Sequence, residues 1–189
     1  MTFPEDIEAA VAIMRQGGVI VYPTDTVWGI GCDARCSDAV RRVFEIKHRS
    51  DSKALITLVS DEDMLSECVG EVNDAIREVM NAVERPTTIV YPLARGLAPE
   101  LLAEDGSVGV RLTREAYSAA LCRGLGAPVV STSANISGEP TPGCFADISE
   151  QILDKADYVA QARRDEMACP SPSRVIKVEA DGSITVIRP

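Results

Sequence analysis

The sequence is poor in lysine, histidine and aromatic residues. Its 189 residues include four lysines and one histidine, and aromatic side chains make up 4% of the chain. A single histidine excludes a metal site built on two histidines, and any Ser–His–Asp triad would depend on His48. The formal net charge is −10. The chain therefore lacks the overall positive charge that is typical of proteins that bind nucleic acid through its phosphates.

Long apolar runs and paired cysteine motifs are also lacking. No apolar run approaches the roughly 20 residues that a membrane-spanning helix needs, and the first residues have no basic start or long apolar stretch typical of a signal peptide. The six cysteines include no CxxC pair, so we expect no zinc site and no disulfide framework. We expect a cytoplasmic protein that does not associate with membranes and binds no metal through its own side chains.

Short apolar segments alternate with amphipathic ones over most of the chain, which predicts an α/β domain. We expect helices from Pro4 to about Gly17, after a Ser37-Asp38 cap, and at about 61–68, 72–84, 114–124 and 147–154. We expect strands at 18–23, shortly after 28, and at 54–59, 87–91, 107–112, 128–134 and 157–161. A terminal hairpin around Asp181-Gly182 predicts a mixed sheet. With no repeat or linker, one domain over 1–189 is expected.

The heptapeptide KHRSDSK, residues 47–53, holds two of the four lysines, with Arg49 between them. The preceding helix has an apolar stripe that includes Val40 and Val43, and continuing this stripe leads to Lys47. We therefore predict that Lys47 faces inward, toward the edge of the core or a cleft.

The basic residues of this region fall into two groups with different expected roles. Arg41 and Arg42 are expected to be ordinary helix surface. Lys47, Arg49 and Lys53 are predicted to bind an anion, and two lysines that flank an arginine suit a triphosphate.

Polar side chains follow two of the predicted strands. STSANISG (131–138) comes directly after an apolar strand, and YPTDTVWG (22–29) follows a strand end in the same way. Ligands of α/β proteins tend to bind at such strand ends, although a polar turn would explain either segment alone. Arg111 lies within the apolar strand VGVRL. A buried arginine needs an anionic partner, which is either a protein carboxylate or a substrate carboxylate.

The segment GIGCDA (29–34) matches the dinucleotide pattern GxGxxG/A. Its context differs, because the next helix is expected only from Ser37. We therefore interpret these glycines as permitting a tight turn or a close backbone approach.

Four segments together resemble the YrdC-like family: PTDTVWGIGCDA, KHR with Lys53, SVGVR and STSANISG. The resemblance covers roughly residues 5 to 178 and is to single-domain members. It implies an open, twisted mixed sheet with helices packed on it and a concave basic cleft. It also implies a nucleotidyltransferase that makes threonylcarbamoyl-adenylate and pyrophosphate from L-threonine, bicarbonate and ATP. A separate complex would then transfer the threonylcarbamoyl group to tRNA.

The resemblance also implies roles for individual residues. The family's K-x-R and S-x-N motifs fall on the expected catalytic residues Lys47, Arg49, Ser133 and Asn135. ATP is expected to contact these four residues together with Lys53 and Ser131. L-Threonine is expected to contact Thr24, Thr26, Arg111 and Thr132. Mg²⁺ would be held mainly by the phosphates.

The sequence departs from the family pattern at a late motif, and other functions stay open. The family's late Ser-Thr-Val motif is Ser173-Arg174-Val175 here, which bears on a late contact to the nucleotide. The alternatives are an RNA-binding YrdC-like module with weak tRNA or RNA affinity, a paralogue without synthase activity, and a carbamoyl-adenylate domain of another pathway.

Overall fold

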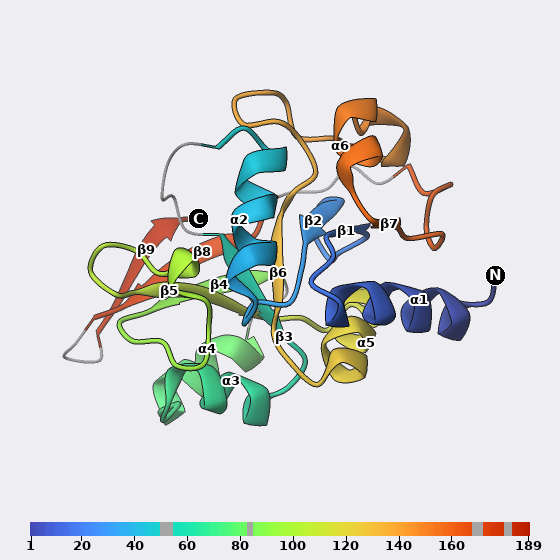
Figure 1. Cartoon of the computed structure of the whole chain (residues 1–189). Helices are drawn as coiled ribbons and strands as arrows, with labels where there is room; N and C mark the ends of the chain where they lie inside the picture. Colours follow the sequence, from blue (N-terminus) through green and yellow to red (C-terminus); the bar gives the residue numbers. More distant parts are fainter. Residues whose placement is uncertain (50–54, 83–84, 168–171, 180–182) are drawn as a thin grey trace.

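The computed structural model describes residues 1–49, 55–82, 85–167, 172–179 and 183–189. Its strands form one mixed sheet in the order β7-β1-β2-β6-β3-β5-β4-β8-β9 (Figure 1). The strands are β1 (Ile20–Tyr22), β2 (Gly29–Gly31), β3 (Ile56–Val59), β4 (Thr87–Tyr91), β5 (Val108–Leu112), β6 (Val129–Ser133), β7 (Tyr158–Val159), β8 (Arg174–Val178) and β9 (Ile184–Arg188). The helices are α1 (Phe3–Arg15), α2 (Ser37–Ile46), α3 (Glu62–Val69), α4 (Asp74–Ala82), α5 (Ala116–Leu125) and α6 (Glu150–Lys155), with short 3₁₀ turns η1 (Pro99–Leu101) and η2 (Phe145–Asp147).

The sheet is mixed, as the sequence predicts. Strand β6 lies between β2 and β3 and runs antiparallel to both, whereas β3 pairs with β5 in parallel. The expected terminal hairpin is confirmed, because β8 and β9 pair antiparallel. Its expected Asp181-Gly182 turn lies outside the described residues.

The helices bury their apolar faces in two clusters. Helices α1 and α5 lie side by side, and they join β1, β2, β6 and α2 in the larger cluster (Figure 1). Helices α3 and α4 cover β3, β4, β5 and β8 in the second cluster.

Two local expectations need correction or refinement. The expected Ser37-Asp38 cap is wrong, because Cys36 is the N-cap residue of α2 and no side chain accepts a capping hydrogen bond there. Residues 29–31 form strand β2 and no dinucleotide turn. A Cβ atom on Gly31 would lie 1.7 Å from the Val130 carbonyl oxygen, so this glycine permits the close backbone approach that the sequence suggests.

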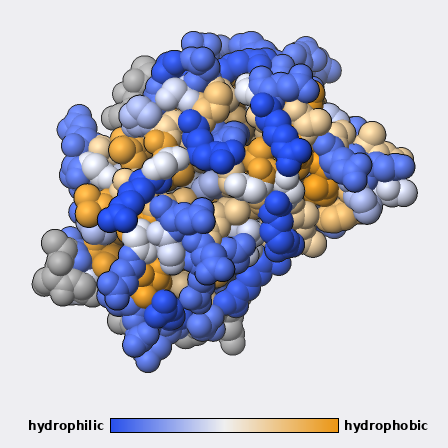
Figure 2. Space-filling view, turned by 60° about the horizontal axis from the view of Figure 1, so that its bottom comes forward, coloured by the Kyte–Doolittle hydropathy of each residue, from blue (hydrophilic) through white to orange (hydrophobic). Residues whose placement is uncertain are grey.

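Figure 2 shows one face on which hydrophilic residues predominate and smaller hydrophobic areas lie between them. Strand β9 is exposed along its length and carries three of the exposed large apolar side chains, Ile184, Val186 and Ile187. Within the described ranges, every helix is too short or too polar to cross a bilayer.

Candidate functional site

Two adjoining cavities lie around the carboxyl end of β6. The first, here called the arginine cavity, has a volume of about 210 Å³. It is lined by Thr26, Val27, Leu55, Ile56, Arg111, Ser131, Thr132, Ser133, Thr141, Pro172, Ser173 and Arg188. The second, here called the lysine cavity, has a volume of about 430 Å³ and is lined by Lys47, Arg49, Thr132, Ser133, Asn135, Ser137 and Gly138. Because both are lined by Thr132 and Ser133, a ligand in one can reach the other along the end of β6.

The charges lining these two cavities are of one sign. The described lining residues include the cations Lys47, Arg49, Arg111 and Arg188 and no carboxylate. The chain as a whole carries a formal net charge of −10. A site of positive charge in an acidic protein favours an anionic ligand.

Lys47 is buried at the end of α2, as the apolar stripe predicts, with 2% of its surface exposed. Its ammonium donates hydrogen bonds to the main-chain carbonyls of Ser133 and Asn135, the latter at 2.6 Å. Burial, aided by the neighbouring charge of Arg49, lowers the pKa of Lys47 to about 8. An ammonium has three N–H donors, so two hold the turn after β6 and a third remains for a ligand in the lysine cavity.

The turn after β6 is held by main-chain contacts as well. The Ser137 amide donates to the Lys47 carbonyl at 2.9 Å. The Asn135 side-chain amide donates to the carbonyls of Ile136 and Glu139 at 3.1 and 2.7 Å. Its buried Oδ1 atom has no hydrogen-bond partner among the described residues. The side chain is therefore fixed with its oxygen available as an acceptor.

The hydroxyls of Thr24 and Thr26 have a defined direction of donation. Thr24 Oγ1 donates its one proton to the Val27 carbonyl at 2.7 Å. It must therefore accept from Thr26 Oγ1, which lies 3.1 Å away. Arg111 in turn donates to Thr26 Oγ1 at 3.4 Å. Thr26 thus uses its proton within the protein and presents an acceptor lone pair to the arginine cavity.

Arg111 forms an ion pair with Asp25, with Nη2 and Oδ1 2.9 Å apart. The side chains of Arg111 and Asp25 are 3% and 16% exposed. Burial raises the pKa of Asp25, and the attraction of Arg111 offsets part of this rise. Burial also lowers the pKa of Arg111, but a guanidinium remains charged at neutral pH. In this state the anionic partner of Arg111 is a protein carboxylate.

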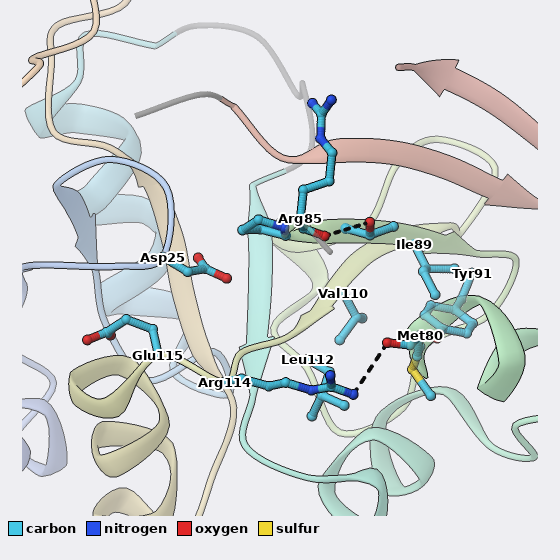
Figure 3. Close-up of a pocket in the computed structure, with 11 residues that line it drawn as sticks. Asp25, Met80, Arg85, Ile89, Tyr91, Val110, Leu112, Arg114 and Glu115 are labelled. Atoms are coloured by element: carbon cyan, nitrogen blue, oxygen red, sulfur yellow. Dashed lines mark hydrogen bonds between the residues drawn. The ribbon is translucent and has the colours of Figure 1, made fainter. Parts of the chain in front are cut away.

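A third cavity, of about 280 Å³, lies on the α4 side of β4 and β5 (Figure 3). Its floor is apolar and includes Val110 and Leu112, the strand neighbours of Arg111, while Asp25 stands at its wall. Arg114 at its rim already donates to the Asn81 side chain at 3.0 Å. This cavity has mixed charge, and several of its polar groups are engaged within the protein.

The structure brings together most of the residues that the sequence predicts. Thr26, Arg111, Ser131, Thr132 and Ser133 line the arginine cavity, and Lys47, Arg49, Thr132, Ser133 and Asn135 line the lysine cavity. Thr24 is buried and lies outside both linings, where its hydroxyl supports Thr26. Lys53 lies outside the described residues. Arg41 and Arg42 form ion pairs on the surface of α2, as expected.

Several lining residues were not among the site residues predicted from the sequence, and Arg188 and Ser173 are two of them. Arg188, the last residue of β9, donates to the carbonyl oxygen of Ser173 at 2.9 Å and to its hydroxyl at 3.3 Å. Ser173 also shares a 2.9 Å hydrogen bond with Thr88. Ser173 thus contributes to the site despite the altered motif around it. The signal for Arg188 was a cation at the end of the last alternating strand.

Comparisons with known proteins identify the family of this chain. The family model Sua5_yciO_yrdC, described as "Telomere recombination", matches residues 12–189. A threonylcarbamoyl-AMP synthase from Xanthomonas campestris pv. campestris (strain B100) is 36% identical over 177 residues, which cover 92% of this chain and 95% of the relative.

Solved structures share the fold. P. abyssi Sua5 complexed with L-threonine superposes with a TM-score of 0.84 at 25% identity, covering 97% of this chain and 53% of that longer one. E. coli YciO superposes with a TM-score of 0.82 at 27% identity, covering 96% of this chain and 87% of that one.

Proposed function

Because this chain belongs to the Sua5–YciO–YrdC family, we propose that it is a threonylcarbamoyl-AMP synthase. The observation that carries the proposal is the pair of adjoining cavities lined by four cations and, among the described residues, no carboxylate. One cavity suits a small carboxylate substrate and the other suits a polyphosphate. Their shared wall, Thr132 and Ser133, is where the two substrates would meet.

The reaction has two steps. The amine of L-threonine attacks bicarbonate and water leaves, which gives the N-carboxy derivative. An oxygen of this carbamate then attacks the α-phosphate of ATP, and pyrophosphate leaves with the electrons of the broken P–O bond. The enzyme is thus a nucleotidyltransferase that moves AMP to the carbamate.

The residues of the lysine cavity would act on the phosphates. Negative charge grows on the departing pyrophosphate, so Lys47 and Arg49 would stabilise it electrostatically, and we propose the same role for Lys53. Ser131, Ser133 and Asn135 would orient the nucleotide, which is a positioning role.

The residues of the arginine cavity would bind the amino acid. Arg111 would bind the carboxylate of L-threonine through the guanidinium N–H groups that Asp25 and Thr26 leave unused. Thr26 presents an acceptor, so it suits a donor on the substrate, either the ammonium or the side-chain hydroxyl. Thr132 lies between the two cavities and would contact the reacting end of the amino acid. Thr24 would support Thr26 and leave substrate contact to it.

The described donors of this site suit a magnesium ion that is held mainly by the phosphates of the substrate. Mg²⁺ prefers oxygen ligands such as carboxylates and phosphates, and the described lining residues offer no carboxylate. The described part of the chain also contains no cluster of three or more His, Cys, Asp or Glu side chains that could hold a metal. We propose that Mg²⁺ enters with the triphosphate of ATP and neutralises part of its charge.

The product points to partners in tRNA modification. Threonylcarbamoyl-adenylate is a reactive mixed anhydride, so a second enzyme complex in the cytoplasm would take the threonylcarbamoyl group to tRNA. We propose that residues 1–189 act as one catalytic domain and bind tRNA weakly or not at all, since the chain has a net charge of −10.

Mass spectrometry after incubation with ATP, L-threonine and ¹³C-bicarbonate tests the proposal. We expect threonylcarbamoyl-adenylate that carries one ¹³C atom, together with pyrophosphate, and no such product when L-threonine is omitted. Intact substrates after incubation would refute the synthase function. Salt-dependent binding of RNA in the same preparation would then favour the RNA-binding alternative.

A further inference from the structure

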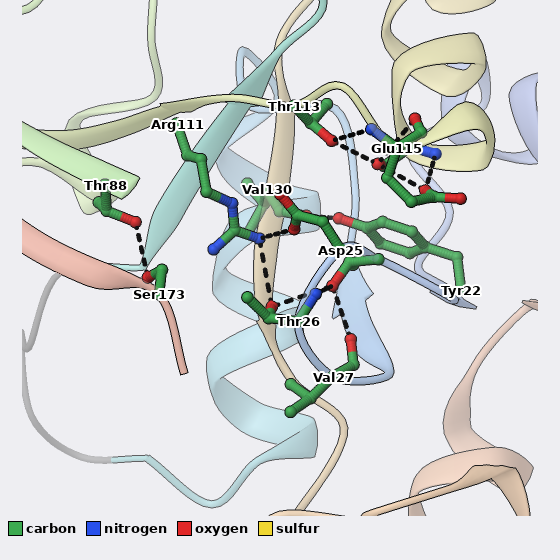
Figure 4. A network of polar contacts seen from close by, with 12 residues as sticks. Tyr22, Asp25, Thr26, Val27, Thr88, Arg111, Thr113, Glu115, Val130 and Ser173 are labelled. Atoms are coloured by element: carbon green, nitrogen blue, oxygen red, sulfur yellow. Dashed lines mark hydrogen bonds and ion pairs between the residues drawn. The ribbon is translucent and has the colours of Figure 1, made fainter. Parts of the chain in front are cut away.

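The ion pair between Asp25 and Arg111 joins two cavities that are otherwise separate. Arg111 lines the arginine cavity, whereas Asp25 lines the cavity under α4. Figure 4 shows the guanidinium reaching from β5 toward Asp25 and Thr26. The carboxylate therefore contacts Arg111 from outside the lining of the arginine cavity, and a ligand there need not replace it.

A buried arginine needs such a support. Removing one partner of a buried ion pair leaves an uncompensated buried charge, which is strongly destabilising. Arg111 is 3% exposed, and Asp25 is the described carboxylate that pairs with it. Without Asp25, we expect the guanidinium to shift from its position toward solvent.

The donors of Arg111 are divided between the protein and the cavity. Its Nη2 atom lies 2.9 Å from Asp25 and 3.4 Å from the Thr26 hydroxyl. Its buried Nε atom has no hydrogen-bond partner among the described residues. A guanidinium is planar and rigid, so fixing Nη2 also fixes the direction of the remaining donors.

The loop that carries Asp25 is itself held in place on both sides. The Thr24 hydroxyl donates to the Val27 carbonyl at 2.7 Å and closes the loop around Asp25. Arg163 donates to the Thr24 carbonyl at 3.1 Å and pairs with Glu115 at 3.2 Å. The Asp25 carboxylate is therefore a fixed point against which Arg111 can be oriented.

We propose that Asp25 is a positioning residue for substrate recognition: it holds the Arg111 guanidinium so that its remaining donors meet the carboxylate of the amino-acid substrate. The proposal rests on the proposed function and adds a residue that touches the substrate only through Arg111. Asp25 thereby determines how well the arginine cavity binds the amino acid, while the lysine cavity and its nucleotide are unaffected.

The test compares steady-state kinetics of wild type, Asp25→Asn, Arg111→Gln and the double variant. Asp25→Asn removes the charge and keeps the shape. We expect the KM for L-threonine to rise about tenfold or more, with kcat and the KM for ATP changed less than about threefold, as for a loss of uniform substrate binding. In the Arg111→Gln background, Asp25→Asn should change the threonine KM by less than about twofold, because its partner is already gone.

Asp33→Asn is the matched control. Asp33 also pairs with an arginine, Arg35, at 2.8 Å, and its side chain is 12% exposed, close to the 16% of Asp25. Neither residue of the control pair lines the two cavities. We expect Asp33→Asn to leave the threonine KM unchanged.

Asp25→Glu provides a test if the Asn variant does not fold. It keeps the charge and adds one methylene, which displaces the carboxylate against Arg111. We expect the threonine KM to rise about threefold or more, since buried sites accommodate added methylenes poorly. An unchanged threonine KM in this variant would overturn the proposal.

The outcomes separate this proposal from the proposed function. If wild type makes no threonylcarbamoyl-adenylate, the function itself fails. If wild type is active and Asp25→Asn has an unchanged or lower threonine KM, the positioning role is wrong and the function stands. A lower KM would mean that Asp25 competes with the substrate for Arg111.

Discussion

The ammonium of Lys47 donates a 2.6 Å hydrogen bond to the main-chain carbonyl of Asn135. This contact joins the end of α2 to the turn that follows β6. It gives Lys47 two tasks, since the same ammonium shapes the turn and lines the lysine cavity. Replacing Lys47 therefore affects both the local structure and the binding of phosphate.

Lys47→Met should reduce adenylate formation about 10²–10³-fold, because an electrostatic contact to the departing pyrophosphate is lost. Methionine is similar in length and apolar, so it fills the buried space better than alanine does. The measurement is the rate of pyrophosphate release that depends on both L-threonine and bicarbonate. Unfolding in urea, followed in parallel, reports the contribution of Lys47 to the turn.

Lys177→Met is the control for Lys47→Met. Lys177 lies on β8, is about one-third exposed and pairs with Asp105 at 3.6 Å, away from both cavities. Its replacement should leave the rate within about twofold of wild type, since exposed ion pairs contribute little. Near-normal activity in Lys47→Met would contradict the assigned role.

The rate should fall at alkaline pH because Lys47 must be charged to stabilise phosphate. With a pKa of about 8, kcat/KM for ATP should be flat below pH 8 and decline above it when L-threonine and bicarbonate are saturating. The pKa of Lys47 is lower in the folded state than in the unfolded state, so deprotonation stabilises the folded state. The decline in kcat/KM is therefore not caused by unfolding. Lys47→Arg should show no such alkaline decline, whatever its absolute rate, because arginine stays charged.

Thr26→Val should mainly weaken substrate binding, whereas Thr24→Val should mainly destabilise the fold. Thr26→Val removes the acceptor facing the arginine cavity, so the KM for L-threonine should rise about tenfold, the value of one lost hydrogen bond. Thr24→Val leaves the partly buried Thr26 amide without its acceptor, so it should lower the free energy of unfolding by about 1–3 kcal/mol. Kinetics and urea denaturation together distinguish them. The reverse pattern would place Thr24 in contact with the substrate.

Gly31→Ala should destabilise the fold severely. The added Cβ would lie 1.7 Å from the Val130 carbonyl oxygen, and that oxygen is held by a 2.8 Å hydrogen bond from the Tyr22 hydroxyl. We expect the free energy of unfolding to fall by about 3 kcal/mol or more, as for overpacking against backbone that cannot move. Gly109→Ala, where the nearest atom is 3.4 Å away, is the control and should cost much less. Similar urea midpoints for the two variants would contradict this explanation.

Features that depend on local periodicity were predictable from the sequence. The helical stripe through Val40 and Val43 places Lys47 inward, and all three side chains are buried. The strand with Arg111 is present and buried along most of its length, as its apolar sequence predicts, and the need for an anionic partner follows from burial alone. The polar segment after β6 was also identified as part of the site.

Features that depend on distant contacts were not predictable. The identity of the Arg111 partner, Asp25, follows from how the loop after β1 packs against β5, and no periodic pattern in the sequence indicates this packing. Arg188 resembles any cation at a strand end until the sheet order brings β9 next to β8. The cap of α2 was misplaced by one residue because Ser37 and Asp38 favour caps in general, whereas the backbone turns at Cys36.

The sheet order has a consequence for how the protein folds. Gly29 of β2 pairs with Ser133 of β6, and β6 has no neighbour in the sheet that is adjacent to it in the sequence. Closing such long loops is slow, because their entropy is lost before the pairing stabilises them. The wall that both cavities share therefore forms late in refolding. Recovery of ligand affinity after dilution from denaturant should accordingly lag behind the recovery of helical signal.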